Sequence, residues 1–92
     1  MFLIWVHSYA NTHKRIGLWL EDCDFEAHKG RGQAWLTRDK TKAKRFAEKG
    51  DAFEFWTTVP KRMPRRPDGK PNKPLTAYSV EILPEGEDPM NF

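Results

Sequence analysis

Three stretches of apolar, β-branched and aromatic residues, separated by polar segments, predict β-strands. The first, Phe2–Tyr9, is typical of a buried strand. After the polar turn Ala10–Arg15, the stretch Ile16–Leu20 predicts a second strand that pairs antiparallel with the first. The third, Leu75–Leu83, alternates with period two and is expected to pair with the first strand. The face of this third strand that we expect to be buried carries Tyr78, Val80 and Ile82.

The second strand changes its apolar parity near Glu21. Up to Leu20 the apolar residues occupy even positions, whereas Cys23 and Phe25 occupy odd ones. Either a β-bulge near Glu21 joins the two halves, or the strand ends there. The following segment Lys29–Gln33 predicts a loop, because its two glycines suit positive φ angles.

Two helices are predicted between residues 37 and 60. A short apolar segment, Ala34–Leu36, precedes Thr37, which is a good N-cap, and Asp51 is placed to cap a second helix. The residues at helical spacing are Ala43, Phe46 and Ala47 in the first helix, and Ala52, Phe53, Trp56 and Val59 in the second. Pro60 is expected to end the second helix.

Together these elements predict a single α+β domain over residues 1–84. We expect a small antiparallel sheet of three or four strands with one or two short helices on one face. The order is strand, strand, short strand, helix, helix, strand. A basic proline-rich loop spans residues 60–74, and an acidic tail, residues 85–92, is expected to be loosely attached.

The composition and the apolar runs of the chain indicate its cellular compartment. The apolar start Met1–Val6 is too short for a signal peptide and lacks its charged region, and no apolar run is long enough for a transmembrane helix. The single cysteine, Cys23, excludes an intramolecular disulfide. These features favour a cytoplasmic protein.

Charge is distributed unevenly along the chain. Residues 1–37 are balanced, residues 38–73 hold twelve basic and five acidic residues, and residues 74–92 hold four acidic residues and no basic ones. The proline-rich loop alone contains five of the seven prolines and six of the sixteen basic residues. We expect the central segment to attract phosphates or an acidic protein surface, and the tail to fold back on it as a counter-charge.

The candidate partner-binding residues are the cations of the first predicted helix and of the loop. They are Arg38, Lys42, Lys44, Arg45, Lys61, Arg62, Arg65, Arg66, Lys70 and Lys73. Such a surface favours salt-sensitive binding of nucleic acid, or of an acidic or RNA-coated protein. A solvated helix face and a soluble loop without a partner would show the same pattern.

No catalytic or cofactor-binding motif is present, so we expect neither enzymatic activity nor a cofactor. Asp22, Asp24, Glu26 and His28 would share one face of a continued strand, but their side chains would splay too far apart to meet at one metal ion. We therefore interpret them as an exposed acidic strand edge or a contact for a basic partner. Cys23 lies among acids, which raise the pKa of a thiol and make it a poor nucleophile.

One stretch resembles a known kind of protein. The resemblance is carried by Trp35-Leu-Thr-Arg-Asp39, then Ala43-Lys-Arg-Phe46 and Asp51-Ala52. With these, residues 34–59 resemble a pattern found in short hypothetical proteins of phages and prophages. The resemblance implies a mobile-element setting, in which small domains such as anti-CRISPR proteins bind and disable larger machinery. It assigns no functional residue. On this basis we expect a non-enzymatic inhibitor that docks on a host defence protein or ribonucleoprotein complex. The alternatives are a small DNA- or RNA-binding accessory protein and an assembly subunit.

Overall fold

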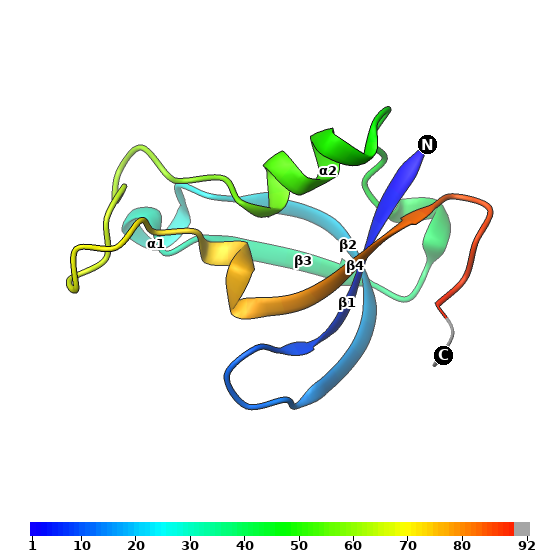
Figure 1. Cartoon of the computed structure of the whole chain (residues 1–92), viewed down its shortest axis with the longest axis horizontal. Coiled ribbons are helices and arrows are strands. Elements are labelled where there is room, and N and C mark those ends of the chain that lie inside the picture. Colours follow the sequence, from blue (N-terminus) through cyan, green and yellow to red (C-terminus); the bar gives the residue numbers. More distant parts are fainter. Residues whose placement is uncertain (90–92) are drawn as a thin grey trace.

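The computed structural model describes residues 1–89 and shows a four-stranded antiparallel sheet in the order β3-β2-β1-β4 (Figure 1). β1 (Phe2–Tyr9) lies between β2 (Arg15–Asp24) and β4 (Tyr78–Pro84), and β3 (Gln33–Thr37) pairs with β2. The predicted α+β class and the pairing of the last strand with the first are confirmed. Across residues 1–89, every helix is too short or too polar to cross a membrane.

β2 contains a bulge near Glu21, which was one of the two interpretations of the parity change. Its register with β3 shifts between Leu20 and Asp22, so that Glu21 is the extra residue. As a result Leu20 and Cys23 contribute to the same core although their positions differ in parity. The strand then ends at Asp24, and the turn that follows contains α1 (Ala27–Gly30), in which His28 and Lys29 have positive φ angles.

One face of the sheet is covered by α2 (Lys49–Trp56), which lies across β1 and β4 (Figure 1). The buried residues of this core are Ile4, Val6, Leu20, Phe46, Ala52 and Leu75. α2 contributes Ala52, Phe55 and Trp56, which follow the i, i+3, i+4 spacing of a buried helical stripe. The indole Nε1–H of Trp56 donates a 2.9 Å hydrogen bond to the carbonyl of Leu75, in the 3₁₀ turn η2 (Pro74–Ala77).

The predicted apolar face of α2 is wrong at two positions. Phe53 is 54% exposed, because it lies beside the Ala52–Phe55–Trp56 stripe of the helix and not within it. Val59 is also exposed, because α2 ends at Trp56 rather than at Pro60. The helix begins with a capping box in which Glu48 is the N-cap and Asp51 its partner at the third helical position.

The opposite face of the sheet has a core of its own. It consists of Leu3, Trp5, Trp19, Ala43 and Leu83. The rings of Trp5 and Trp19 meet edge to face with centroids 4.9 Å apart, and the Nζ of Lys40 lies 5.4 Å from the ring centroid of Trp19. The cover on this face therefore comes from the basic segment after β3.

That basic segment is not the predicted first helix. Only Lys40–Lys42 form a 3₁₀ turn, η1, and its N-cap is Asp39 rather than Thr37. The chain then runs extended, and the backbones of Phe46 and Phe2 exchange two hydrogen bonds of 2.7 and 2.9 Å. These bonds place the segment at the end of the sheet, with Ala43 in one core and Phe46 in the other, whereas Ala47 is exposed. Pairing with strand backbone therefore prevails over the helical pattern of the side chains.

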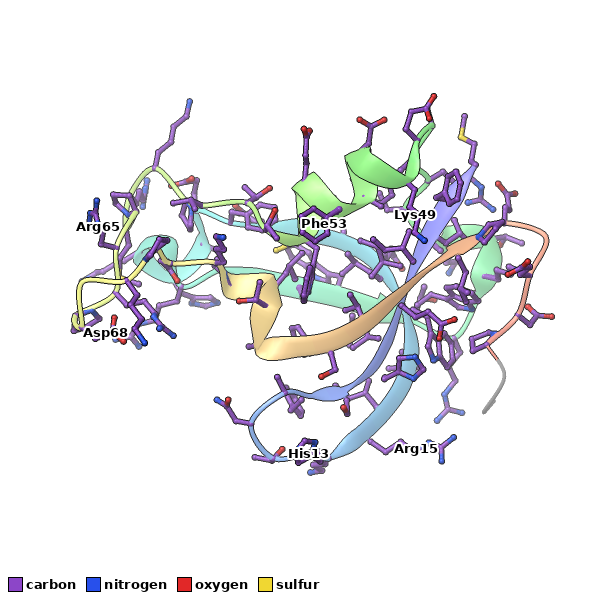
Figure 2. The ribbon with its side chains drawn as sticks, in the orientation of Figure 1. His13, Arg15, Lys49, Phe53, Arg65 and Asp68 are labelled. Atoms are coloured by element: carbon purple, nitrogen blue, oxygen red, sulfur yellow. The ribbon has the colours of Figure 1, made fainter. Side chains whose placement is uncertain are left out.

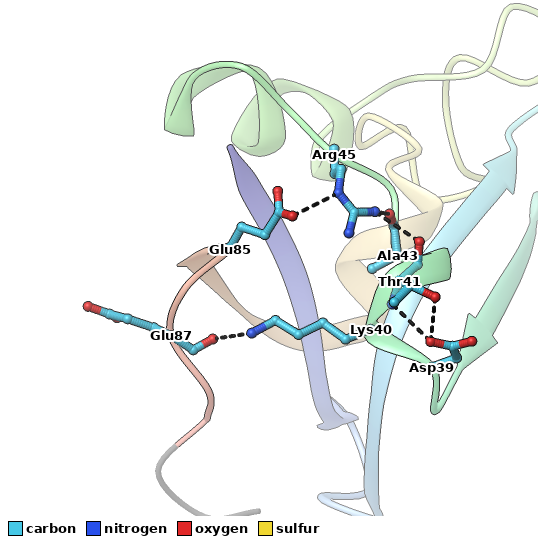
Figure 3. A network of polar contacts seen from close by, with 7 residues as sticks. All are labelled: Asp39, Lys40, Thr41, Ala43, Arg45, Glu85 and Glu87. Atoms are coloured by element: carbon cyan, nitrogen blue, oxygen red, sulfur yellow. Dashed lines mark hydrogen bonds and ion pairs between the residues drawn. The ribbon is translucent and has the colours of Figure 1, made fainter.

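The acidic tail folds back on this segment (Figure 3). Arg45 Nε lies 3.2 Å from Glu85 Oε2, and Lys40 Nζ donates to the carbonyl of Glu87 and to Asp88 Oδ1, each at 3.0 Å. Pro89 is buried. The predicted counter-charge is confirmed, and the expectation of a loosely attached tail is wrong for residues 85–89. Residues 90–92, the rest of that predicted tail, lie outside the described residues.

Candidate anion-binding surface

The proline-rich loop, residues 60–74, is held in place at its start by a single carboxylate. Glu26 accepts hydrogen bonds from the backbone N–H of Lys61 at 2.7 Å and of Arg62 at 2.9 Å. These bonds, first that of Lys61 and then that of Arg62, hold the pKa of Glu26 below its ordinary value. The carboxylate is therefore charged at neutral pH and fixes the first leg of the loop.

A buried asparagine fixes the second leg. Asn72 is 7% exposed, and its Nδ2 donates to the carbonyls of Gly30 at 2.7 Å and of Met63 at 2.9 Å. Its backbone N–H donates to the carbonyl of Pro64 at 3.0 Å. One side chain thus joins the two legs of the loop to each other and to the turn between β2 and β3.

The tip of the loop has hairpin-like bonds of its own. Arg65 and Pro71 form an isolated bridge, and the Arg66 N–H donates to the carbonyl of Lys70 at 2.8 Å. Gly69, with a φ of +85°, closes the turn by donating its N–H to the carbonyl of Arg66. Figure 2 shows Arg65 and Asp68 at one extreme of the molecule. These bonds fix the conformation of the loop, although it contains neither a helix nor a strand of the sheet before η2.

The turn between β2 and β3 packs against the loop and adds two cations. The backbone of Gly30, at a φ of +90°, is so close to Met63 that an added Cβ would lie 2.7 Å from the Met63 Cβ. Lys29 and Arg31 flank this contact. We call the combined surface the basic end. Its cations are Lys29, Arg31, Lys61, Arg62, Arg65, Arg66, Lys70 and Lys73, and all are exposed.

The basic end carries little compensating charge. Among its cations, the one ion pair found within residues 1–89 joins Arg66 to Asp68 at 3.2 Å. Arg65 is held by a neutral group, since its Nη1 donates to the carbonyl of Gly69 at 2.9 Å. Fixed charges of one sign on an ordered backbone project a field that attracts anions.

At the other end of the 39 Å long axis, three of the six cations of residues 38–49 have ion pairs within residues 1–89 (Figure 1). There the tail pairs with Lys40 and Arg45. Nearby, Lys44 lies 3.7 Å from Asp22 and its Nζ is 5.0 Å from the ring centroid of Phe55. Exposed ion pairs stabilise the fold little, but each cancels a charge that would otherwise act on a partner.

The predicted partner-binding residues are therefore split into two groups. The structure brings together those of the loop, Lys61, Arg62, Arg65, Arg66, Lys70 and Lys73. It leaves four others, Arg38, Lys42, Lys44 and Arg45, on the separate segment that the tail covers in part. The two groups do not share the continuous surface that a basic helix beside the loop would have formed.

Sequence reasoning missed Lys29 and Arg31. The signal was present, because Gly30 and Gly32 flank Arg31 and both adopt the positive φ angles that the loop prediction assigned to them. Their proximity to residues 60–74 depends on the contacts of Gly30, Met63 and Asn72, which no local pattern encodes.

The acidic stretch has a structural use. Because β2 ends at Asp24, Glu26 turns toward the loop, and Asp24 Oδ1 accepts the N–H of Glu26 at 3.1 Å. Within residues 1–89 no group of three or more His, Cys, Asp and Glu side chains is arranged to hold a metal ion. Burial, then Asp22 and Asp24, raise the pKa of the Cys23 thiol to about 11, so the thiol is protonated and unreactive at neutral pH.

The geometry supports binding of an anionic partner by an ordered cationic surface. Comparison with known proteins adds no identity, since no family model, curated protein or solved structure matches the chain.

Proposed function

We propose that this protein is a non-enzymatic binding protein that docks through its basic end on a larger ribonucleoprotein complex and blocks it. The observation that carries the proposal is the contrast between the two ends of the molecule. Near the tail, Lys40 pairs with Asp88 and Arg45 with Glu85, whereas seven of the eight cations of the basic end have no ion pair within residues 1–89. Charges left unpaired on an ordered surface are available to a partner.

The order of the loop supports docking. A flexible loop loses conformational entropy when a partner fixes it, and this loss weakens binding. Here Glu26 and Asn72 hold both legs of the loop before any partner arrives. Five prolines restrict the backbone further.

The proposed setting is a mobile genetic element acting inside a host cell. It rests on the resemblance of residues 34–59 to short phage and prophage proteins, among which anti-CRISPR proteins disable host defence complexes. Such a target contains RNA, whose phosphates match the charge of the basic end. The proposed compartment is accordingly the host cytoplasm.

Affinity purification of the tagged chain from a host lysate, with and without nuclease, tests this proposal. A stoichiometric protein partner that survives nuclease and moderate salt is expected, together with loss of the partner's activity. Recovery of no specific partner under either condition would contradict the proposal.

The second candidate is direct binding of free DNA or RNA through the same surface. It is favoured because, within residues 1–89, no ion pair is formed by the side chains of Lys29, Arg31, Lys61, Arg62, Lys70 and Lys73. In the same purification this candidate predicts co-purifying nucleic acid and loss of all protein partners after nuclease treatment.

A further inference from the structure

Two hollows adjoin each other beside the second leg of the loop. The larger, of about 350 Å³, lies between the β2–β3 turn and the end of the loop and is lined by polar and charged side chains. The smaller, of about 180 Å³, lies beside it, and Arg31, Pro74 and Ala77 line both. A volume of about 350 Å³ falls in the range of small-molecule binding sites.

The larger hollow is cationic. Arg31, Arg66 and Lys73 line it together with the neutral groups of Asn11, Asn72 and Thr76. Within residues 1–89, Arg66 has an ion pair with Asp68, whereas Arg31 and Lys73 have none. Three cations and several hydrogen-bonding groups around one hollow suit a phosphate group, which carries negative charge on several acceptor oxygens.

The smaller hollow is bordered by aromatic rings. Tyr9 and Tyr78 line it, with ring centroids 5.2 Å apart and planes inclined by 31°. Tyr9 is 41% exposed, so part of its ring is free for a further contact. Gln33 lies on the same rim; its Oε1 is 3.0 Å from His28 Nε2, and its amide nitrogen is a hydrogen-bond donor. An aromatic ring beside a cationic groove is the arrangement by which proteins bind single-stranded nucleic acid.

We propose that these two hollows bind one nucleotide of a single strand, with its phosphate among Arg31, Arg66 and Lys73 and its base against Tyr9. The inference rests on the proposed function and names the part of the ribonucleoprotein that the basic end contacts: a single-stranded segment that the complex shields from nuclease. Duplex bases are stacked inside the helix and cannot reach Tyr9, so single strands bind more tightly than duplexes of equal length.

Fluorescence anisotropy with labelled 12-nucleotide single strands and the matching duplex tests this at low and moderate salt. Tyr9→Leu removes the ring and is expected to weaken single-strand binding about 5- to 150-fold, the range measured for loss of one stacked base, with little effect on the duplex. Tyr9→Phe keeps the ring and the affinity. Arg31→Gln and Lys73→Gln weaken binding of the single strand more than Lys42→Gln, which removes one charge outside the hollows.

Equal affinity for single strand and duplex overturns the inference, as does a Tyr9→Leu variant that binds like Tyr9→Phe. Binding to neither oligonucleotide also overturns it. In these cases a nuclease-resistant protein partner in the purification would leave the proposed function standing, so the two failures are distinguishable. Circular dichroism of each variant confirms that it is folded.

Discussion

The side-chain amide of Asn72 donates a 2.7 Å hydrogen bond to the carbonyl of Gly30, 42 residues earlier in the chain. The same nitrogen donates to the carbonyl of Met63 at 2.9 Å. One buried side chain thereby joins the end of the proline-rich loop, its beginning and the β2–β3 turn. This junction gives the basic end its shape, because it brings Arg31 beside the loop cations.

Replacing Asn72 tests that junction. Asn72→Ala leaves two carbonyls without their donor and is expected to lower the free energy of unfolding by about 1–3 kcal/mol. Urea denaturation measures the loss, and hydrogen exchange is expected to show faster exchange at the amides of residues 61–72. Asn11→Ala, a substitution at an exposed asparagine, is the control and should change stability little. Unchanged stability and loop exchange in Asn72→Ala would contradict the assigned role.

The contact between the turn and the loop is tested by replacing Gly30, with Gly50 as the control position. Gly30→Ala forces a side chain onto a residue with a φ of +90° and places its Cβ 2.9 Å from the backbone nitrogen of Met63. We expect a loss of more than about 1 kcal/mol. Gly50→Ala, in the first turn of α2 with open space around it, should instead stabilise the protein by about 0.5–1 kcal/mol. Thermal unfolding measures both, and effects of the same sign would contradict this account.

Acidification should release the first leg of the loop. Because the N–H groups of Lys61 and Arg62 lower the pKa of Glu26 in the folded protein, this contribution to stability is present above about pH 4.5, the ordinary glutamate pKa. It is lost as the pH falls through the lower, folded-state pKa. The amide proton shifts of Lys61 and Arg62, followed by NMR, should titrate with that depressed midpoint.

Glu26→Gln is the control for this titration, since a neutral amide cannot titrate. In that variant the same two amide signals should show no transition in the acidic range. A midpoint at or above the ordinary glutamate value in the wild-type protein would mean that the hydrogen bonds to Glu26 do not form.

Because residues 43–47 are extended and not helical, substitutions at Phe46 and Ala47 are expected to have different effects on stability. Phe46 is 8% exposed and packs in the α2-side core, so Phe46→Ala should cost about 3–5 kcal/mol. Ala47 is exposed, and Ala47→Asp should change stability by no more than about 0.5 kcal/mol. Urea denaturation of both variants checks this. A large loss of stability in Ala47→Asp would instead indicate that Ala47 is buried, as in the predicted helical stripe.

The sheet could be predicted because its signals are local. The alternation of Tyr78, Val80 and Ile82, and the parity change at Glu21, follow directly from the two-residue period of a strand. The sequence pattern thus located the irregularity of β2, for which a bulge was one of two interpretations, and the alternating strand that pairs with β1.

The segment after β3 could not be predicted in the same way. Ala43, Phe46 and Ala47 have helical spacing, yet the backbone of Phe46 forms two hydrogen bonds with that of Phe2, which is far away in sequence. A long-range bridge of this kind overrides a weak local preference. For the same reason the loop cations were recognised from the sequence, while their separation from Lys44 and Arg45, and their meeting with Arg31, depended on tertiary contacts.

The central claim is that the basic end is the docking surface, and two double variants test it. Lys70→Glu with Lys73→Glu reverses two loop charges that have no ion pair within residues 1–89. Lys42→Glu with Lys49→Glu makes the same change in net charge away from the loop, also at exposed positions. Arg65 and Arg66 are left intact, because Arg65 bonds to Gly69 and Arg66 pairs with Asp68.

The measurement is the amount of partner recovered by each folded variant from the same host lysate, over a series of salt concentrations. We predict that the loop variant loses the partner at least about tenfold and that its binding depends less steeply on salt, while the control variant resembles the wild type. Equal recovery by the two variants would contradict the claim that the protein docks through its basic end.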